Sequence, residues 1–116
     1  MSTKRIQKGP RMSQAVVHGG MVYLSGQVAQ GAPGGSVTEQ TRDILSRIDG
    51  LLAEAGTDKS KLLTANIWLV DIRTFDEMNA VWDAWIDPQN PPTRACVESR
   101  LAATRFTVEI AVTAAL

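Results

Sequence analysis

The residues best suited to chemistry lie near the C-terminal end, in two short segments that alternate as β-strands do. Arg94 and Cys96 share one face of the segment 93–98, and Glu109 lies inside the apolar run 106–112. Arginine presents a planar fork that binds a carboxylate through two hydrogen bonds. A carboxylate with apolar neighbours can orient or activate water, with its pKa tuned for that task. These residue types suit the binding of a carboxylate and the placement of a water molecule.

The pairing of these two segments decides what Arg94 does. In an antiparallel hairpin, Arg94 faces Glu109 and Cys96 faces Thr107, all on one face of the sheet. The same register pairs apolar side chains on the opposite face, which favours it. Arg94 is then either the partner of Glu109 in an ion pair, which spacing alone favours, or a carboxylate-binding residue. Glu109 is either the counter-charge of Arg94 or the group that handles water.

Cys96 is the only thiol of the chain, and His18 is the only imidazole. The register places no base near Cys96, so we expect a small packed residue rather than a nucleophile. One cysteine and one histidine make neither a disulfide nor a zinc site. The carboxylates are scattered along the chain, so we expect no metal ion.

The elements that position these residues follow from apolar periodicity. One domain over residues 1–116 is expected, with an α+β fold in the order β-β-α-β-α-β-β. A hairpin turns at His18, and a helix over 37–55 begins at a capping box of Ser36 and Glu39 and ends at Gly56. The further elements are a strand over 62–70 with Leu63, Ala65, Ile67 and Leu69 on one face, a helix beginning at a capping box of Thr74 and Glu77, and strands over 93–98 and 106–114.

Two amphipathic helices are expected to cover one face of the mixed sheet. The other face would carry a mixture that is too polar for a core and too apolar for plain solvent exposure, namely Trp68, Arg94, Cys96, Thr107 and Glu109. A surface of this kind favours association with other copies of the chain.

Charge and composition narrow the partners. Twelve basic residues balance twelve acidic ones, so we expect no nucleic-acid partner, and no cluster of Lys and Arg changes that expectation. No apolar run is long enough to span a membrane, and the N-terminus lacks the apolar core of a signal peptide. We therefore expect a cytoplasmic protein without a membrane partner.

The motifs resemble those of the YjgF/RidA family of reactive intermediate deaminases along nearly the whole chain. The most specific are the PTRACV segment and the VEI segment with their spacing. The matching segments are SQAV 13–16, LSGQ 24–27, EQTRDIL 39–45, FDEMNAVWDAW 75–85, PPTRACVESRLA 91–102 and VEIAVTA 108–114.

This resemblance implies a chorismate-mutase-like fold and a homotrimer with ligand clefts between subunits. It also implies a hydrolase of the 2-iminobutanoate/2-iminopropanoate deaminase type, which converts enamines and imines such as 2-aminoacrylate to a 2-keto acid and ammonia. The resemblance further implies that no metal or organic cofactor is used. Arg94 matches the arginine that holds the substrate carboxylate, and Glu109 matches the acid that positions water. The residues that match the pocket wall are Ser25, Gly26, Asn79 and Cys96.

One position departs from the family pattern. Active deaminases of the family usually read GPYSQ where this chain reads GPRMSQ, so Met12 replaces a pocket tyrosine. A flexible thioether there leaves the substrate range open. The alternative function is a trimer that binds a keto acid or amino acid without turnover. Family members have also been called ribonucleases, for which the balanced charge gives little support.

Overall fold

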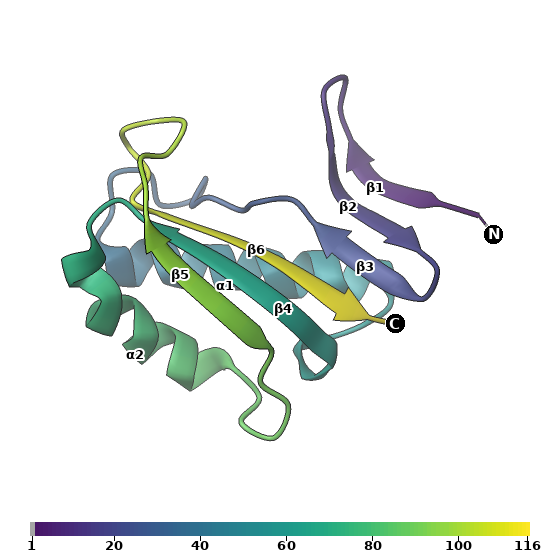
Figure 1. Cartoon of the computed structure of the whole chain (residues 1–116). Helices are drawn as coiled ribbons and strands as arrows, with labels where there is room; N and C mark the ends of the chain where they lie inside the picture. The colour runs from purple at the N-terminus through teal and green to yellow at the C-terminus, as the bar shows by residue number, and fades with distance from the viewer. Residues whose placement is uncertain (1) are drawn as a thin grey trace.

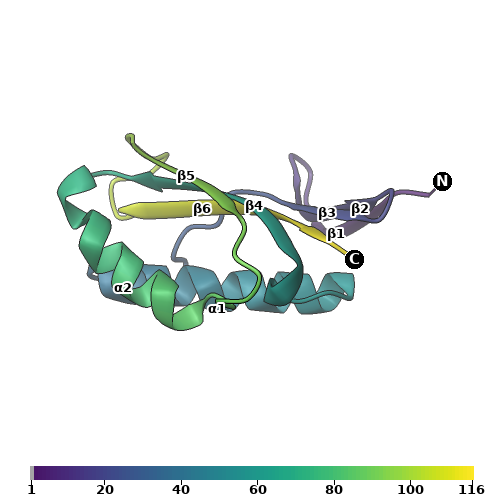
Figure 2. The same ribbon diagram turned by 60° about the horizontal axis from the view of Figure 1, so that its bottom comes forward.

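The main element of the structure is a six-stranded mixed sheet with the strand order β1-β2-β3-β6-β4-β5 (Figure 1). This computed structural model describes residues 2–116. Two α-helices cover one face of the sheet, as predicted (Figure 2). The elements are β1 Lys4–Lys8, β2 Ser13–His18, β3 Met21–Leu24, α1 Val37–Ala55, β4 Leu62–Leu69, α2 Phe75–Trp85, β5 Thr93–Glu98 and β6 Val108–Ala115, with short 3-10 turns at Lys59–Lys61 and Ile72–Thr74.

The first strand, β1, is missing from the predicted order, which is otherwise confirmed. β1 forms one edge of the sheet and pairs antiparallel with β2. Only Ile6 of its five residues is buried, so the segment has no apolar alternation to detect. Charged residues on an edge strand also hinder pairing with another chain, which explains why a strand tolerates this composition.

The position of β4 between β5 and β6 shows that the predicted hairpin is wrong. β5 pairs with β4 in parallel, because α2 carries the chain back across the sheet before β5 begins. β6 pairs antiparallel with the other edge of β4. Arg94 consequently lies opposite Ala65, and Glu109 lies opposite Trp68. Adjacency in sequence suggested the hairpin, and the crossover helix overrides it.

Helix α1 begins and ends where the sequence predicts. Ser36 Oγ accepts from the amide of Glu39 at 3.1 Å, and the Glu39 carboxylate accepts from the amide of Ser36 at 3.0 Å. Gly56 closes the helix in the left-handed conformation, with φ of 90°. Its apolar stripe, including Ile44, Ile48 and Leu52, packs on the sheet and is fully buried.

Helix α2 lacks the predicted capping box. Thr74 is the N-cap, but its side chain makes no capping hydrogen bond. Its hydroxyl instead donates to the carbonyl of Asp71 at 2.6 Å. The Glu77 carboxylate accepts from both the amide and the hydroxyl of Thr38, at 2.9 and 3.0 Å. Glu77 therefore does not cap its own helix at Thr74. It forms a tertiary contact that joins α2 to the start of α1.

The inward face of β4 differs from the prediction at its start. Ala65, Ile67 and Leu69 are buried beneath the helices as predicted, but Leu63 is 41% exposed. A register shift between Leu62 and Thr64 turns Leu62 inward in its place. A bulge of this kind reverses the side-chain alternation locally, which period-two reasoning does not anticipate.

Candidate functional site

Arg94 lies on β5, the edge strand next to α2, and its guanidinium is held by side chains of that helix. Nη1 donates to Asn79 Oδ1 at 2.7 Å. The guanidinium carbon lies 5.4 Å from the ring centre of Trp82 and 5.7 Å from that of Phe75. Among residues 2–116, no carboxylate lies within ion-pair distance of Arg94. The fork is therefore oriented but has no anionic partner in its own chain.

Cys96 lies two residues along β5 and packs partly against the core. Burial raises the pKa of its thiol, and the positive charge of Arg94 offsets this only in part. The thiol therefore stays protonated near neutral pH, which agrees with a packing role rather than a nucleophilic one. Arg94, Asn79 and Cys96 form the first group of candidate residues, which we call the arginine half-site.

A second group forms where the segment after β3 runs beside β6. The amide of Gln27 donates to the carbonyl of Ile110 at 2.8 Å, and the amide of Ile110 returns a hydrogen bond at 3.1 Å. This pairing presses Gly26 against Glu109. A Cβ on Gly26 would overlap Glu109 Oε2 and would lie only 2.9 Å from its Cδ. Glycine is therefore required for the carboxylate to occupy its position.

The segment that carries Gly26 is fixed by a polar network. Ser25 Oγ donates to Gln14 Oε1 at 3.1 Å, and Gln27 Nε2 donates to the same oxygen at 2.9 Å. Gln27 is 7% exposed, so this network is well shielded from water. The sequence motifs SQAV and SGQ contain both glutamines, but sequence reasoning gave them no role. Ser25, Gly26 and Glu109 form the second group, the glutamate half-site.

The carboxyl group of Glu109 has an unusual environment for an acid. It is half-buried on the face of the sheet away from the helices, in the same row as Trp68. Burial raises the pKa of Glu109 above its ordinary value. A carboxyl group with a raised pKa exchanges protons nearer to neutral pH, which suits acid–base work.

The structure does not bring the two half-sites together within one chain. Arg94 and Cys96 lie on the helix-covered face, whereas Glu109 lies on the open face, so the prediction that they share a face is wrong. β4 separates their strands. Neighbouring strands lie about 4.8 Å apart, so β5 and β6 are about 10 Å apart. The ion pair between Arg94 and Glu109 is therefore absent, and one small molecule cannot bridge both groups in one chain.

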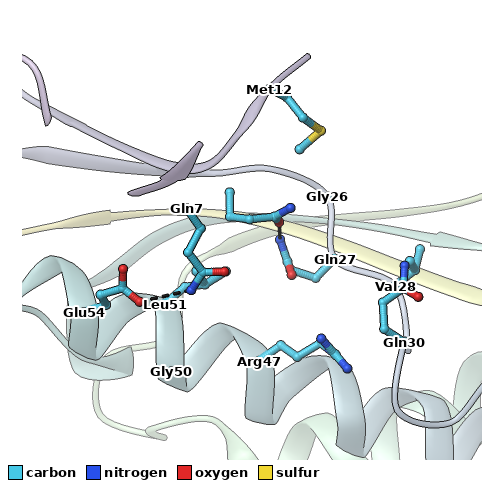
Figure 3. Close-up of a pocket in the computed structure, with 11 residues that line it drawn as sticks. Gln7, Met12, Gly26, Gln27, Val28, Gln30, Arg47, Gly50, Leu51 and Glu54 are labelled. Carbon is cyan, nitrogen blue, oxygen red and sulfur yellow. Dashed lines mark hydrogen bonds between the residues drawn. The ribbon is translucent and has the colours of Figure 1, made fainter. Parts of the chain in front are cut away.

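Met12 occupies a third position, in the turn between β1 and β2. It is 46% exposed and lines a cavity of about 490 Å³ between this hairpin and α1 (Figure 3). Gly26 also lines this cavity, whereas Arg94 and Glu109 do not. Met12 is thus near the glutamate half-site but belongs to a separate space.

The β1–β2 hairpin carries four exposed basic residues, although the whole chain has equal numbers of basic and acidic residues. These are Lys4, Arg5, Lys8 and Arg11, and all four are exposed. This hairpin therefore departs locally from the balanced charge of the whole chain. Cations on an edge strand also oppose the addition of a further strand, which is a structural reason for them.

Two negative findings apply to the part of the chain that the structure describes. Residues 2–116 contain no group of three or more His, Cys, Asp or Glu side chains that could hold a metal ion. None of the helices in this range has the length and apolar character needed to cross a membrane.

Known proteins are similar to this chain in sequence and fold. The family model described as Endoribonuclease L-PSP matches residues 2–116. A RutC family protein of Haemophilus influenzae is 40% identical over 114 residues, which cover 98% of each chain. The RutC family protein YoaB of Escherichia coli is 35% identical over 116 residues, the full length of both chains. The solved structure of NMB1025 from Neisseria meningitidis, a YjgF family member, has a TM-score of 0.95 and 44% identity, covering 99% of this chain and 95% of that one.

The class of protein follows from the layers. A mixed six-stranded sheet with two helices on one face defines an α+β protein of the expected kind. Together with the matches along the whole described chain, this shows that the protein belongs to the YjgF/RidA family.

Proposed function

We propose that this protein is an enamine/imine deaminase, a hydrolase that converts 2-imino acids to 2-keto acids and ammonia. The observation that carries the proposal is that the Arg94 guanidinium is held in place but has no carboxylate partner within residues 2–116. Its guanidinium is oriented by Asn79 at 2.7 Å and by two aromatic rings, yet no carboxylate of residues 2–116 neutralises it. An oriented, uncompensated fork suits a substrate carboxylate.

The reaction needs little more than orientation of the substrate and of one water molecule. An enamine such as 2-aminoacrylate first becomes its imine. Glu109 then takes one proton from water while the water oxygen bonds to the imine carbon, and it passes this proton to the imine nitrogen, which gives a carbinolamine. The hydroxyl proton of the carbinolamine moves to the nitrogen through the same carboxylate as the carbon–nitrogen bond breaks, so the carbonyl of the keto acid forms and ammonia leaves. Holding the carboxylate converts an encounter of two molecules into a reaction within one complex.

The separation of the half-sites supports a second part of the proposal, which is a homotrimer with clefts between subunits. Arg94 and Glu109 cannot touch one substrate in a single chain. The open face of the sheet also leaves Tyr23 46% and Val97 50% exposed, so apolar surface is available for association. A cleft that joins the arginine half-site of one subunit to the glutamate half-site of the next completes the machinery.

The direct test is Arg94→Ala. Imines are generated in situ from several amino acids by an oxidase, and keto-acid formation is followed with and without this protein. We expect Arg94→Ala to abolish the acceleration while the oligomer persists. Arg73→Ala is the matched control, because Arg73 is an exposed arginine whose one ion pair within residues 2–116 is with Asp71. Unchanged turnover in Arg94→Ala would refute the proposal.

A specific observation favours a second candidate, which is a trimer that binds a keto acid or amino acid without turnover. Met12 lacks the hydroxyl that the family tyrosine provides, and its thioether is a weak hydrogen-bond acceptor. This candidate predicts that such ligands raise the melting temperature, while freshly generated imines release ammonia no faster than without the protein.

A further inference from the structure

We propose that the cavity between the β1–β2 hairpin and α1 binds a small carboxylate that also carries an ammonium or amide group. Its volume of about 490 Å³ lies within the range of small-molecule sites, which is roughly 300–1,000 Å³. Figure 3 shows that its walls come from the hairpin, the segment after β3 and one face of α1. The residues that carry the proposal are Gln7, Gln14, Gln27, Arg47, Gly50 and Glu54.

Arg47 supplies the group for the carboxylate. Its Nε donates to Asp43 Oδ2 at 2.8 Å, which anchors the side chain along α1. Its terminal nitrogens have no hydrogen-bond acceptor among residues 2–116, and Figure 3 shows the guanidinium extending toward Gln30. An anchored fork with free terminal nitrogens suits a carboxylate.

Gln27 and Glu54 supply acceptors for N–H groups. Gln27 Nε2 is occupied by Gln14 Oε1 at 2.9 Å and by the carbonyl of Ser25 at 3.1 Å. These bonds fix the amide, so the Gln27 oxygen faces the cavity (Figure 3). Glu54 accepts from Gln7 through Oε1 at 3.0 Å, and its other oxygen has no donor among residues 2–116.

The charges are spread along the cavity in a way that orients a dipolar molecule. Arg47 and Glu54 both line the cavity from α1. A helix rises about 1.5 Å per residue, so their backbones lie about 10 Å apart along the helix axis. A ligand with its carboxylate toward Arg47 and its N–H groups toward Gln27 and Glu54 would match both ends.

Two local features around the cavity have no packing explanation. Gln7 has φ of 49°, and no other non-glycine residue of 2–116 has a positive φ. Such a conformation costs on the order of 1–3 kcal/mol, and here it accompanies the bond from Gln7 to Glu54. Gly50 lies inside α1, where a Cβ would meet nothing within 4 Å. Glycine there costs about 1 kcal/mol relative to alanine, and it leaves the cavity wider.

This site does not depend on imine hydrolysis. The cavity shares Gly26 with the glutamate half-site, but neither Arg94 nor Glu109 lines it. Binding is therefore expected to persist in Arg94→Ala, in which the proposed hydrolysis is removed. The two proposals can fail separately.

The experiment uses L-glutamine as the probe, because it carries a carboxylate, an ammonium and an amide. It is titrated into the full-length, nitrogen-15-labelled protein, and the side-chain NH₂ signals of Gln7, Gln14 and Gln27 are followed by NMR. We expect saturable shifts of these signals in the wild type and in Arg94→Ala. Propionate and propionamide each lack one end of the probe, so we expect both to bind about tenfold more weakly or worse.

Two substitutions at Gly50 provide matched variants. Gly50→Leu fills the cavity, and Gly50→Ala leaves most of it open; both improve helix propensity, so both are expected to fold. We expect about a tenfold or larger loss of affinity in Gly50→Leu and little change in Gly50→Ala. The proposal is overturned by an absence of saturable shifts in the wild type, by equal affinity in both variants, or by loss of binding in Arg94→Ala.

Discussion

Replacement of Gly26 by alanine tests the contact on which the glutamate half-site depends. Gly26 is not among the glycines with positive φ, so its backbone conformation is open to alanine. Only the added methyl group matters, and it would lie 2.9 Å from Glu109 Cδ and 3.2 Å from Cγ. Carbon atoms in contact normally lie about 3.5–4.0 Å apart, so the Glu109 side chain must move.

The expected loss of stability in Gly26→Ala depends on which group can move, the segment around Gly26 or the side chain of Glu109. The backbone of Gln27 is hydrogen-bonded to Ile110 in both directions, so the segment cannot easily retreat. Overpacking of a rigid core costs about 1–3 kcal/mol, and the cost here lies at the lower end, about 1 kcal/mol, because the clashing atoms are the flexible end of the half-buried Glu109 side chain, which can turn away. In a Glu109→Ala background the obstacle is gone, and replacing glycine there is neutral or stabilises by about 0.4–1 kcal/mol through the unfolded chain. The two substitutions should therefore couple by about 0.5 kcal/mol or more.

The assay is urea unfolding of the wild type, both single variants and the double variant. All four are measured at one protein concentration, because association makes stability depend on concentration. Gly50→Ala combined with Glu109→Ala is the control pair, since Gly50 has open space around it. Additive free energies of unfolding for Gly26→Ala and Glu109→Ala would refute the contact.

Two further predictions use the same unfolding assay. Ser36→Ala should destabilise the protein by about 1 kcal/mol, because it removes the cap of α1, whereas Thr74→Ala should show no loss from capping; equal losses would contradict the difference between the two helix starts. Burial raises the pKa of Glu109, so the folded state holds this proton more tightly than the unfolded chain does. The wild-type free energy of unfolding should therefore fall as pH rises from the ordinary glutamate range through the raised pKa, and Glu109→Gln should lack that fall; parallel pH profiles would contradict it.

Elements whose signals are local could be predicted from the sequence. The capping box at Ser36, the apolar stripe and the glycine at Gly56 all lie within α1 or next to it, so its bounds are confirmed. Thr74 and Glu77 have the same spacing as a capping box, but the Glu77 carboxylate accepts hydrogen bonds from Thr38 instead. A short motif does not show which distant group will bind its side chains.

The arrangement of the candidate site could be predicted only in part. The motifs pointed to Arg94, Asn79 and Gly26, and the structure does place Asn79 against Arg94. The position of β4 between β5 and β6 depends on how α2 crosses the sheet, so the pairing of Arg94 with Glu109 did not follow from local alternation. The approach of Gly26 to Glu109 joins positions far apart in sequence, which periodicity alone does not reveal.

Mixing of inactive subunits tests whether the two half-sites belong to different chains of one cleft. Arg94→Ala and Glu109→Ala are each expected to be inactive. After the two proteins are unfolded together in equal amounts and refolded, a cleft works only where an intact Arg94 of one subunit meets an intact Glu109 of its neighbour. Random assembly gives that combination in about one quarter of the clefts, so we expect about one quarter of the wild-type turnover.

The controls for mixing decide between one-chain and two-chain sites. Each variant refolded alone shows the background, and the wild type refolded with Arg94→Ala shows that mixed oligomers form and turn over. Because no single chain in the variant mixture has both groups intact, a site within one chain predicts no recovery at all. Turnover at background level in a mixture whose subunits have exchanged would therefore contradict a shared cleft. Since Arg94 and Glu109 lie on opposite faces with β4 between them, recovery is the outcome that we expect under the proposed function.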